Sequence, residues 1–246
     1  MKKRLSIVLL ILLSITLVFT SCGKKAAAPA AVAPAATVAP APAPAAPAKV
    51  AVDADAVLLA AAKEYFPALA TSNNMISAKD LKALLDDNPD ALVLVDIRSG
   101  ADFEAGHIEG AYHSAWADLG AVMEKIPTNR QVVIVCYSGQ TASQAGGALR
   151  LAGFSNVKIL TGGMNGWKSA GFEAAETGAR PMSSRSNVSS PKSDEQQVLW
   201  DAAKAYFKSV GTDGNKMVTA QNLYDALETN PRAFKVIDIR GESDFA

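Results

Sequence analysis

Apolar positions along the middle of the chain follow two different spacings. Continuous apolar runs occur at residues 92–95, 132–135 and 157–160. Such runs are typical of strands that are covered on both faces of a sheet. Helical spacing of apolar residues is found between and before these runs, at residues 57–66, 77–85, 115–123, 141–151 and 164–169. Strands that alternate with helices predict a parallel sheet with helices on both faces.

This pattern predicts a domain over residues 53–175, followed by a polar linker over residues 176–196 that is rich in Ser, Pro and charged side chains. After the linker the sequence repeats part of the domain. The matching segments are residues 62–66 and 203–207, 88–89 and 230–231, and 94–98 and 236–240. We therefore expect residues 197–246 to be the truncated start of a second, tandem copy of the domain. Because half a domain leaves its core strand without neighbours, the chain after Gln196 is predicted to be poorly packed.

The N-terminal region has the features of an export signal. A basic segment at residues 2–4 precedes an apolar run over residues 5–19. This run is shorter than the roughly 20 residues that a helix needs to cross a bilayer. Residues 17–22 resemble a bacterial lipobox, which implies a lipoprotein signal peptide over residues 1–21 and lipidation of Cys22. The alternative is an uncleaved membrane anchor with an incidental cysteine.

The lipidation site and an Ala/Pro-rich linker occupy residues 22–52, where the prolines disfavour a helix and favour an extended tether. The expected location is the cell envelope, with a lipid anchor at the periplasmic face of the outer membrane or the external face of the cytoplasmic membrane. The chain has 24 basic and 24 acidic side chains, and neither charge is concentrated in an arm or a tail. This balance gives no electrostatic basis for a nucleic-acid partner.

The chain contains two cysteines, so assigning Cys22 to a lipid leaves Cys136 without an intramolecular disulfide partner. Cys136 directly follows the apolar run at 132–135, at the carboxyl end of a predicted strand, where open α/β sheets place ligand sites. The loop after it contains Gly139 and leads into a predicted helix, which we expect to start at Thr141 or Ser143. Backbone N–H groups in such a loop can surround an anion, and a thiolate or persulfide would be stabilised there. The alternative is an inert core cysteine at a strand end.

Four motifs in this order carry a family resemblance: residues 95–98, residues 106–111, the Cys136 loop and residues 162–167. Together they make nearly all of the predicted domain resemble the rhodanese superfamily of sulfurtransferases. The resemblance implies an α/β fold with a five-stranded parallel sheet flanked by helices. It also implies that Cys136 is the catalytic residue and carries a transferable sulfur as a persulfide. The active-site loop would consist of Tyr137, Ser138, Gly139, Gln140, Thr141 and Ala142.

The supporting residues are expected to be Asp96 and Arg98, which would form a structural pair or brace the loop, while His107 would be a hydrogen-bonded turn residue. Glycines 162 and 163 suit a tight turn between a strand and a helix. No cofactor and no metal site are expected, because the chain has two histidines and no cluster of Cys or His.

Two functions from different classes remain open. The first is a sulfurtransferase with a small sulfane-sulfur donor and a thiophilic acceptor, and the second is a non-catalytic binding or redox-sensing module. Thr141 stands where many active members of the family carry an arginine that would bind an anionic donor such as thiosulfate. A phosphatase of the rhodanese-derived type is rejected, since the first arginine after Cys136 is Arg150.

Overall fold

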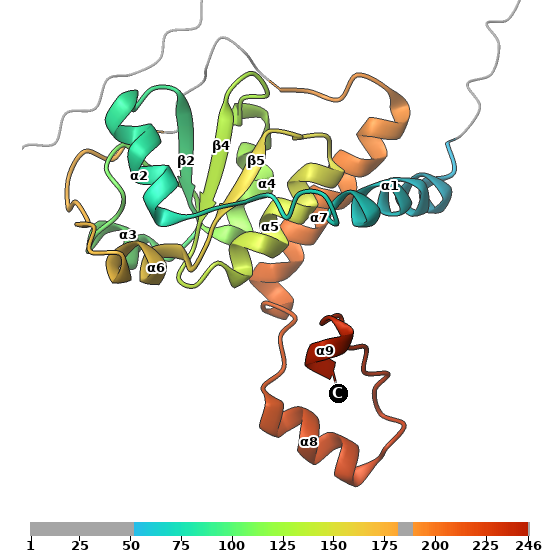
Figure 1. Cartoon of the computed structure of the whole chain (residues 1–246). Coiled ribbons are helices and arrows are strands. Elements are labelled where there is room, and N and C mark those ends of the chain that lie inside the picture. The colour runs from blue at the N-terminus through green and yellow to red at the C-terminus, as the bar shows by residue number, and fades with distance from the viewer. Residues whose placement is uncertain (1–51, 182–188, 246) are drawn as a thin grey trace, which may run out of the picture. The chain divides into compact units, whose positions relative to one another are not determined.

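The computed structural model describes residues 52–181 and 189–245 (Figure 1). The predicted signal peptide, the Cys22 lipidation site and all of the Ala/Pro-rich linker except Val52 lie outside the described residues. Of the helices in the described part of the chain, none is long and apolar enough to cross a membrane.

Parallel strands form a five-stranded sheet in the order β1-β5-β4-β2-β3. The strands are β1 (Met75–Ile76), β2 (Leu92–Asp96), β3 (Tyr112–His113), β4 (Gln131–Val135) and β5 (Val157–Leu160). The central strand β4 pairs with β2 on one side and with β5 on the other. The predicted five-stranded parallel sheet is thereby confirmed. Strands β1 and β3 contain two residues each, too few to leave an apolar run in the sequence.

The continuous apolar runs arise because both faces of the sheet are covered. Alternate side chains of β2 and β4 belong to two separate apolar cores. The core on one face includes Val93, Val95, Val132 and Ile134, and the core on the other includes Leu92, Leu94, Val133 and Val135.

One face is covered by α2 (Ala78–Asp87), α3 (Gly100–Glu104) and α6 (Gly163–Ser169). These helices contribute Leu81, Phe103, Met164 and Trp167 to the core. Helix α2 begins after Ser77, whose hydroxyl oxygen accepts a hydrogen bond from the N–H of Asp80. On this face, α3 follows the carboxyl end of β2 and α6 follows that of β5 (Figure 1).

The opposite face is covered by several elements. They are the 3-10 helices η1 (Trp116–Asp118) and η2 (Met123–Lys125), and the α-helices α4 (Leu119–Val122), α5 (Gln140–Leu151) and α7 (Asp194–Asp213). The helix predicted over residues 115–123 is thus divided into three short pieces. Helix α1 (Ala54–Ala68) contacts α5 and α7 and has no buried residue.

The expectation that the chain packs poorly after Gln196 is wrong for α7. Its side chains Trp200, Ala203 and Phe207 belong to the apolar core of the first domain. The Trp200 ring stacks on Phe154, with 5.4 Å between ring centroids. The apolar surface of α4 and α5 needs a cover that excludes water, and the apolar face of α7 supplies it.

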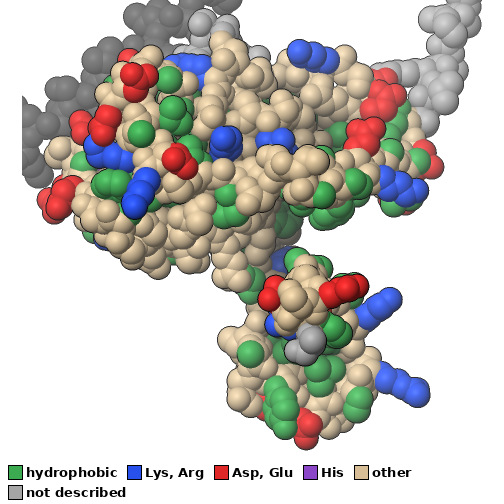
Figure 2. All heavy atoms as spheres, in the orientation of Figure 1, with side chains coloured by type: hydrophobic (Ala, Val, Ile, Leu, Met, Phe, Trp, Pro, Cys, Tyr) green, Lys and Arg blue, Asp and Glu red, His purple; other side chains and the backbone are tan. Residues whose placement is uncertain are grey.

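Residues 215–245 differ from α7, since none of their side chains is buried. They contain α8 (Ala220–Thr229) and α9 (Glu242–Phe245), and the strand expected at 236–240 is not formed. Large apolar side chains are exposed along this segment, at Met217, Val218, Tyr224, Phe234, Val236, Ile237, Ile239 and Phe245 (Figure 2). A strand segment with no neighbouring strand leaves its apolar side chains in water.

Candidate active site

Cys136 is the first residue after the central strand β4. Its residue surface is 1% exposed, and its sulfur accepts two hydrogen bonds from backbone N–H groups. The donors are Gly139, at 3.1 Å, and Ala142, at 3.3 Å. Two N–H dipoles therefore point at one sulfur atom, an arrangement that stabilises a negative charge there.

Gly139 makes the sharp turn that brings these amides to the sulfur. Its φ angle is +91°, in the left-handed region that favours glycine, and it is the N-cap residue of α5. Helix α5 begins at Gln140, earlier than the expected start at Thr141 or Ser143. The positive end of this helix, which includes the Ala142 amide, thus faces Cys136.

The loop is held from behind by the start of α6. The Met164 N–H donates to the carbonyl oxygen of Cys136 at 2.8 Å, and the Asn165 N–H donates to that of Tyr137 at 2.9 Å. A methyl group on Gly163 would collide with the Cys136 carbonyl oxygen, so only glycine permits this approach. The sequence analysis interpreted the glycine pair as a tight turn and missed this contact. The available signal was two consecutive glycines one residue after a predicted strand.

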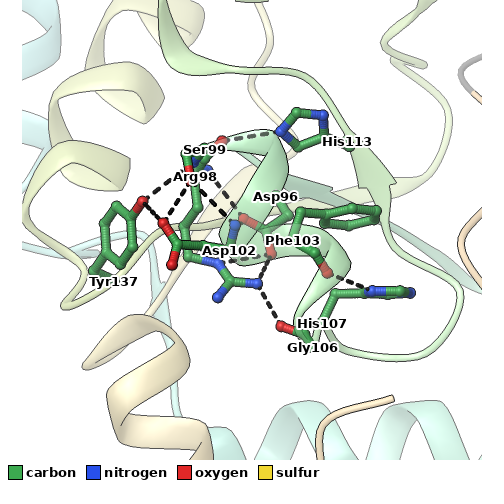
Figure 3. A network of polar contacts seen from close by, with 9 residues as sticks. All are labelled: Asp96, Arg98, Ser99, Asp102, Phe103, Gly106, His107, His113 and Tyr137. Carbon is green, nitrogen blue, oxygen red and sulfur yellow. Dashed lines mark hydrogen bonds and ion pairs between the residues drawn. The ribbon is translucent and has the colours of Figure 1, made fainter. Parts of the chain in front are cut away.

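Asp96 and Arg98 form a buried ion pair next to the loop (Figure 3). Their side chains are 1% and 5% exposed, and Nη2 of Arg98 lies 2.7 Å from Oδ2 of Asp96. The same Nη2 donates to the carbonyl oxygen of Gly106. The guanidinium carbon lies 5.9 Å from the ring centroid of Tyr137, within the range of a cation–π contact. Arg98 therefore connects the end of β2 with the α3 region and the Cys136 loop.

Tyr137 fixes the loop from the other side (Figure 3). Its hydroxyl donates to Oδ2 of Asp102 at 2.6 Å and accepts a hydrogen bond from the Ser99 N–H at 3.2 Å. Hydrogen bonds from Ser99, and secondly from Tyr137, hold the pKa of Asp102 below its ordinary value. Sequence reasoning missed Ser99 and Asp102, although their spacing is that of a capping box at the start of α3.

Both histidines bond to main-chain carbonyl groups near α3. Nδ1 of His107 lies 2.9 Å from the Phe103 carbonyl oxygen, and its ring stacks on Phe103. Nε2 of His113 lies 2.9 Å from the carbonyl oxygen of Arg98. These contacts make both histidines part of the scaffold that positions the Asp96–Arg98 pair (Figure 3).

The outer side of the loop borders a pocket with a volume of about 620 Å³. Tyr137, Ser138, Gln140 and Thr141 line it, together with Trp116. The structure thus places four of the expected loop residues around this pocket, and the remaining two, Gly139 and Ala142, against the sulfur.

Comparison with known proteins identifies rhodanese-like proteins as relatives of this chain. Residues 77–170 match the family model described as a rhodanese-like domain. The chain is 36% identical over 77 residues to thiosulfate sulfurtransferase GlpE of Shewanella oneidensis, covering 31% of this chain and 76% of that protein. The crystal structure of the Alr3790 protein from Anabaena sp. has 30% identity and a TM-score of 0.39, covering 41% of this chain and 81% of that chain. A rhodanese-like domain protein from Staphylococcus aureus has 22% identity and a TM-score of 0.36, covering 38% and 90%.

Proposed function

Because this chain belongs to the rhodanese-like family, we propose that it is a sulfurtransferase that carries sulfane sulfur as a persulfide on Cys136. Similarity to a thiosulfate sulfurtransferase supports a sulfurtransferase-like function at the level of the family. The observation that carries the proposal is the pair of N–H groups, from Gly139 and Ala142, that converge on the Cys136 sulfur.

The proposed reaction has two steps. In the first, the Cys136 thiolate attacks the outer sulfur of a sulfane donor, forming an S–S bond to Sγ while the donor's leaving group departs with the electron pair of the broken bond. In the second, a thiophilic acceptor attacks the outer sulfur of the persulfide, and Sγ departs as a thiolate. The amides of Gly139 and Ala142 stabilise the negative charge on sulfur in both steps.

Mass spectrometry and turnover together test this proposal. After exposure to a sulfane donor, the peptide with Cys136 should gain the mass of one sulfur atom, and a thiol acceptor should remove it. The Cys136→Ser variant should show neither the added mass nor release of sulfide with a thiol acceptor or of thiocyanate with cyanide as the acceptor. Equal release rates from the two proteins would rule out this enzyme function.

We also propose that the protein is a lipoprotein of the cell envelope, with the domain tethered through residues 22–52. The support is the export-like sequence of residues 1–21 and the lipobox-like segment that ends at Cys22. Metabolic labelling with a fatty-acid analogue should mark the wild-type chain and leave Cys22→Ala unlabelled. Labelling of both chains to the same extent would reject the anchor. Residues 197–246 are proposed to belong to a second copy of the domain, because residues 203–207 and 236–240 repeat segments of the first copy.

A non-catalytic binding or redox-sensing module is the second candidate. Thr141 favours it, because this position brings no cation to the loop for binding an anionic donor. The module predicts no stable sulfur on Cys136 and partner binding that Cys136→Ser leaves unchanged. The mass experiment above therefore separates the two candidates.

A further inference from the structure

The pocket outside the Cys136 loop has a second wall that comes from beyond the family match at 77–170. On one side the pocket is lined by loop residues, which include Tyr137 and Thr141. On the other side it is lined by Val210, near the end of α7, and by Met217, which follows that helix. The chain after the predicted linker thus completes the pocket that borders the Cys136 loop.

Helix α7 is held firmly enough to form such a wall. Phe207 is fully buried in the core, and the Tyr206 hydroxyl donates to Oε1 of Gln144 on α5 at 2.9 Å. Lys204 pairs with Glu124 on the η2 side. These contacts lie within two turns of Val210, which is itself buried. The core of the domain therefore sets the position of the Val210 side of this wall. Met217 follows at the start of the segment 215–245, in which no side chain is buried.

This pocket offers no cation to an anionic donor. Among the residues that the structure describes, no charged side chain lines it. The neighbouring Lys216 pairs with Asp213 at 2.8 Å. The guanidinium of Arg98 is buried against Asp96, and the Tyr137 hydroxyl donates to the carboxylate of Asp102, which adds a negative charge beside the loop. A dianion such as thiosulfate would lose its hydration here without gaining an ion pair.

The apolar part of the lining favours another kind of donor. Trp116 and Val210 present apolar surface, and Met217 has an unbranched, polarisable side chain that adapts to irregular groups. Building on the proposed transfer function, we propose that this pocket selects a sulfane-sulfur donor that has an apolar group and at most one negative charge. Met217 would contact that apolar group and act as a specificity-determining residue.

An aromatic thiosulfonate is a suitable probe, because it differs from thiosulfate by one charge and one apolar ring. The Cys136 thiolate would attack its outer sulfur, form the Sγ–S bond and release an aromatic sulfinate with the electron pair of the broken S–S bond. With thiosulfate the same step releases sulfite. The two donors therefore lead to the same persulfide on Cys136 and can be compared directly.

The experiment measures kcat/KM of the full chain with benzenethiosulfonate and with thiosulfate, for wild type, Met217→Ala and Met217→Lys. Met217→Ala should lower the value for benzenethiosulfonate by about tenfold and change that for thiosulfate by less than about twofold. Met217→Lys should shift the preference further toward thiosulfate, since it adds a cation to the wall. The matched control is Val218→Ala, because Val218 is exposed and does not line the pocket.

Two outcomes overturn the proposal in distinguishable ways. Equal changes for the two donors in the Met217 variants, with unaltered circular dichroism, would show that this wall does not select the donor. Absence of turnover and of added sulfur on Cys136 with both donors would reject the transfer function itself, and the donor assignment with it.

Discussion

Helices α1 and α7 contain the same apolar pattern in two different environments. When the matching Lys-x-Tyr-Phe segments at 63–66 and 204–207 are aligned, three apolar positions of α1 and its C-cap residue Leu69 correspond to the buried positions of α7. The pairs are Leu59 and Trp200, Ala62 and Ala203, Phe66 and Phe207, and Leu69 and Val210. Phe66 is 64% exposed, whereas Phe207 is 0% exposed. An apolar stripe thus predicts a helix but does not identify the surface that covers it.

The two matching Asp-x-Arg segments, at 96–98 and 238–240, show the same contrast. Arg240 bonds to Asp238 through its backbone N–H and its guanidinium, as Arg98 bonds to Asp96. The second pair is exposed, at 58% and 26%, while the first is buried. In both segments the aspartate and the arginine are two residues apart, and local geometry alone lets them form the ion pair. Burial requires neighbouring strands. Strands β3 and β4 flank the first pair, whereas the described part of the chain contains no strand after β5.

The largest effect on stability is expected at the buried ion pair of Asp96 and Arg98. Arg98→Ala should lower the free energy of unfolding by about 3–5 kcal/mol, because it leaves the Asp96 carboxylate buried without its partner. Arg240→Ala should leave the free energy of unfolding unchanged within error, since water solvates Asp238. Urea unfolding of the full chain measures both. Similar losses of unfolding free energy in the two variants would contradict the contrast between the two Asp-x-Arg segments.

The aligned phenylalanines give the next largest difference. Phe207→Ala should cost about 3 kcal/mol of unfolding free energy, because it removes a fully buried ring from the core. Phe66→Ala should cost far less, since most of that side chain already faces water. Chemical denaturation monitored by Trp fluorescence provides the measurement. If Phe66→Ala were the more costly change, the assignment of α7 to the domain core would be wrong.

Substitutions at two glycines test the contacts of α7 and α1 with smaller expected effects on stability. A methyl group on Gly120 would lie 3.2 Å from Cα of Lys204, so Gly120→Ala should push on α7 and cost about 1–2 kcal/mol. On Gly147 of α5 the methyl group would meet the Tyr65 hydroxyl of α1 at 3.5 Å, an ordinary contact. Gly147→Ala should therefore stabilise the chain by roughly 0.5 kcal/mol through its helix propensity. Thermal unfolding of both variants gives the sign, and a stabilising Gly120→Ala would contradict close packing of α7.

The smallest effect is expected at Asp102, whose carboxylate accepts hydrogen bonds from the hydroxyl groups of Ser99 and Tyr137. Tyr137→Phe should raise the pKa of Asp102 toward its ordinary value of 3.8, and Ser99→Ala should raise it further, because the Ser99 hydrogen bond is the larger cause. Because the pKa of Asp102 is lower in the folded than in the unfolded chain, this carboxylate stabilises the fold at any pH above its unfolded pKa. The stabilisation is lost as the pH falls through the lowered, folded-state pKa. The difference in unfolding free energy between wild type and the two variants should therefore disappear at a pH below the folded-state pKa of Asp102. Carboxyl NMR titration measures the pKa, and an unchanged value in Tyr137→Phe would exclude this hydrogen bond in solution.

Much of the fold could be predicted from the sequence. The apolar runs at 92–95 and 132–135 are strands, and Cys136 stands directly after the second of them, as predicted. The resemblance to the rhodanese family is confirmed, and so is its five-stranded parallel sheet. The short strands β1 and β3 were not recognisable by pattern, since two residues have no measurable periodicity.

By itself the sequence determined the features that depend on neighbouring residues: the strand ending at Val135, the turn at Gly139 and the local Asp-x-Arg pairs. Only the tertiary structure decided that α7 covers the first domain and that Met217 lines the pocket next to the loop. The physical reason is that burial depends on water being excluded by segments far away in the chain. A phenylalanine side chain is therefore part of a core at position 207 and exposed at the matching position 66.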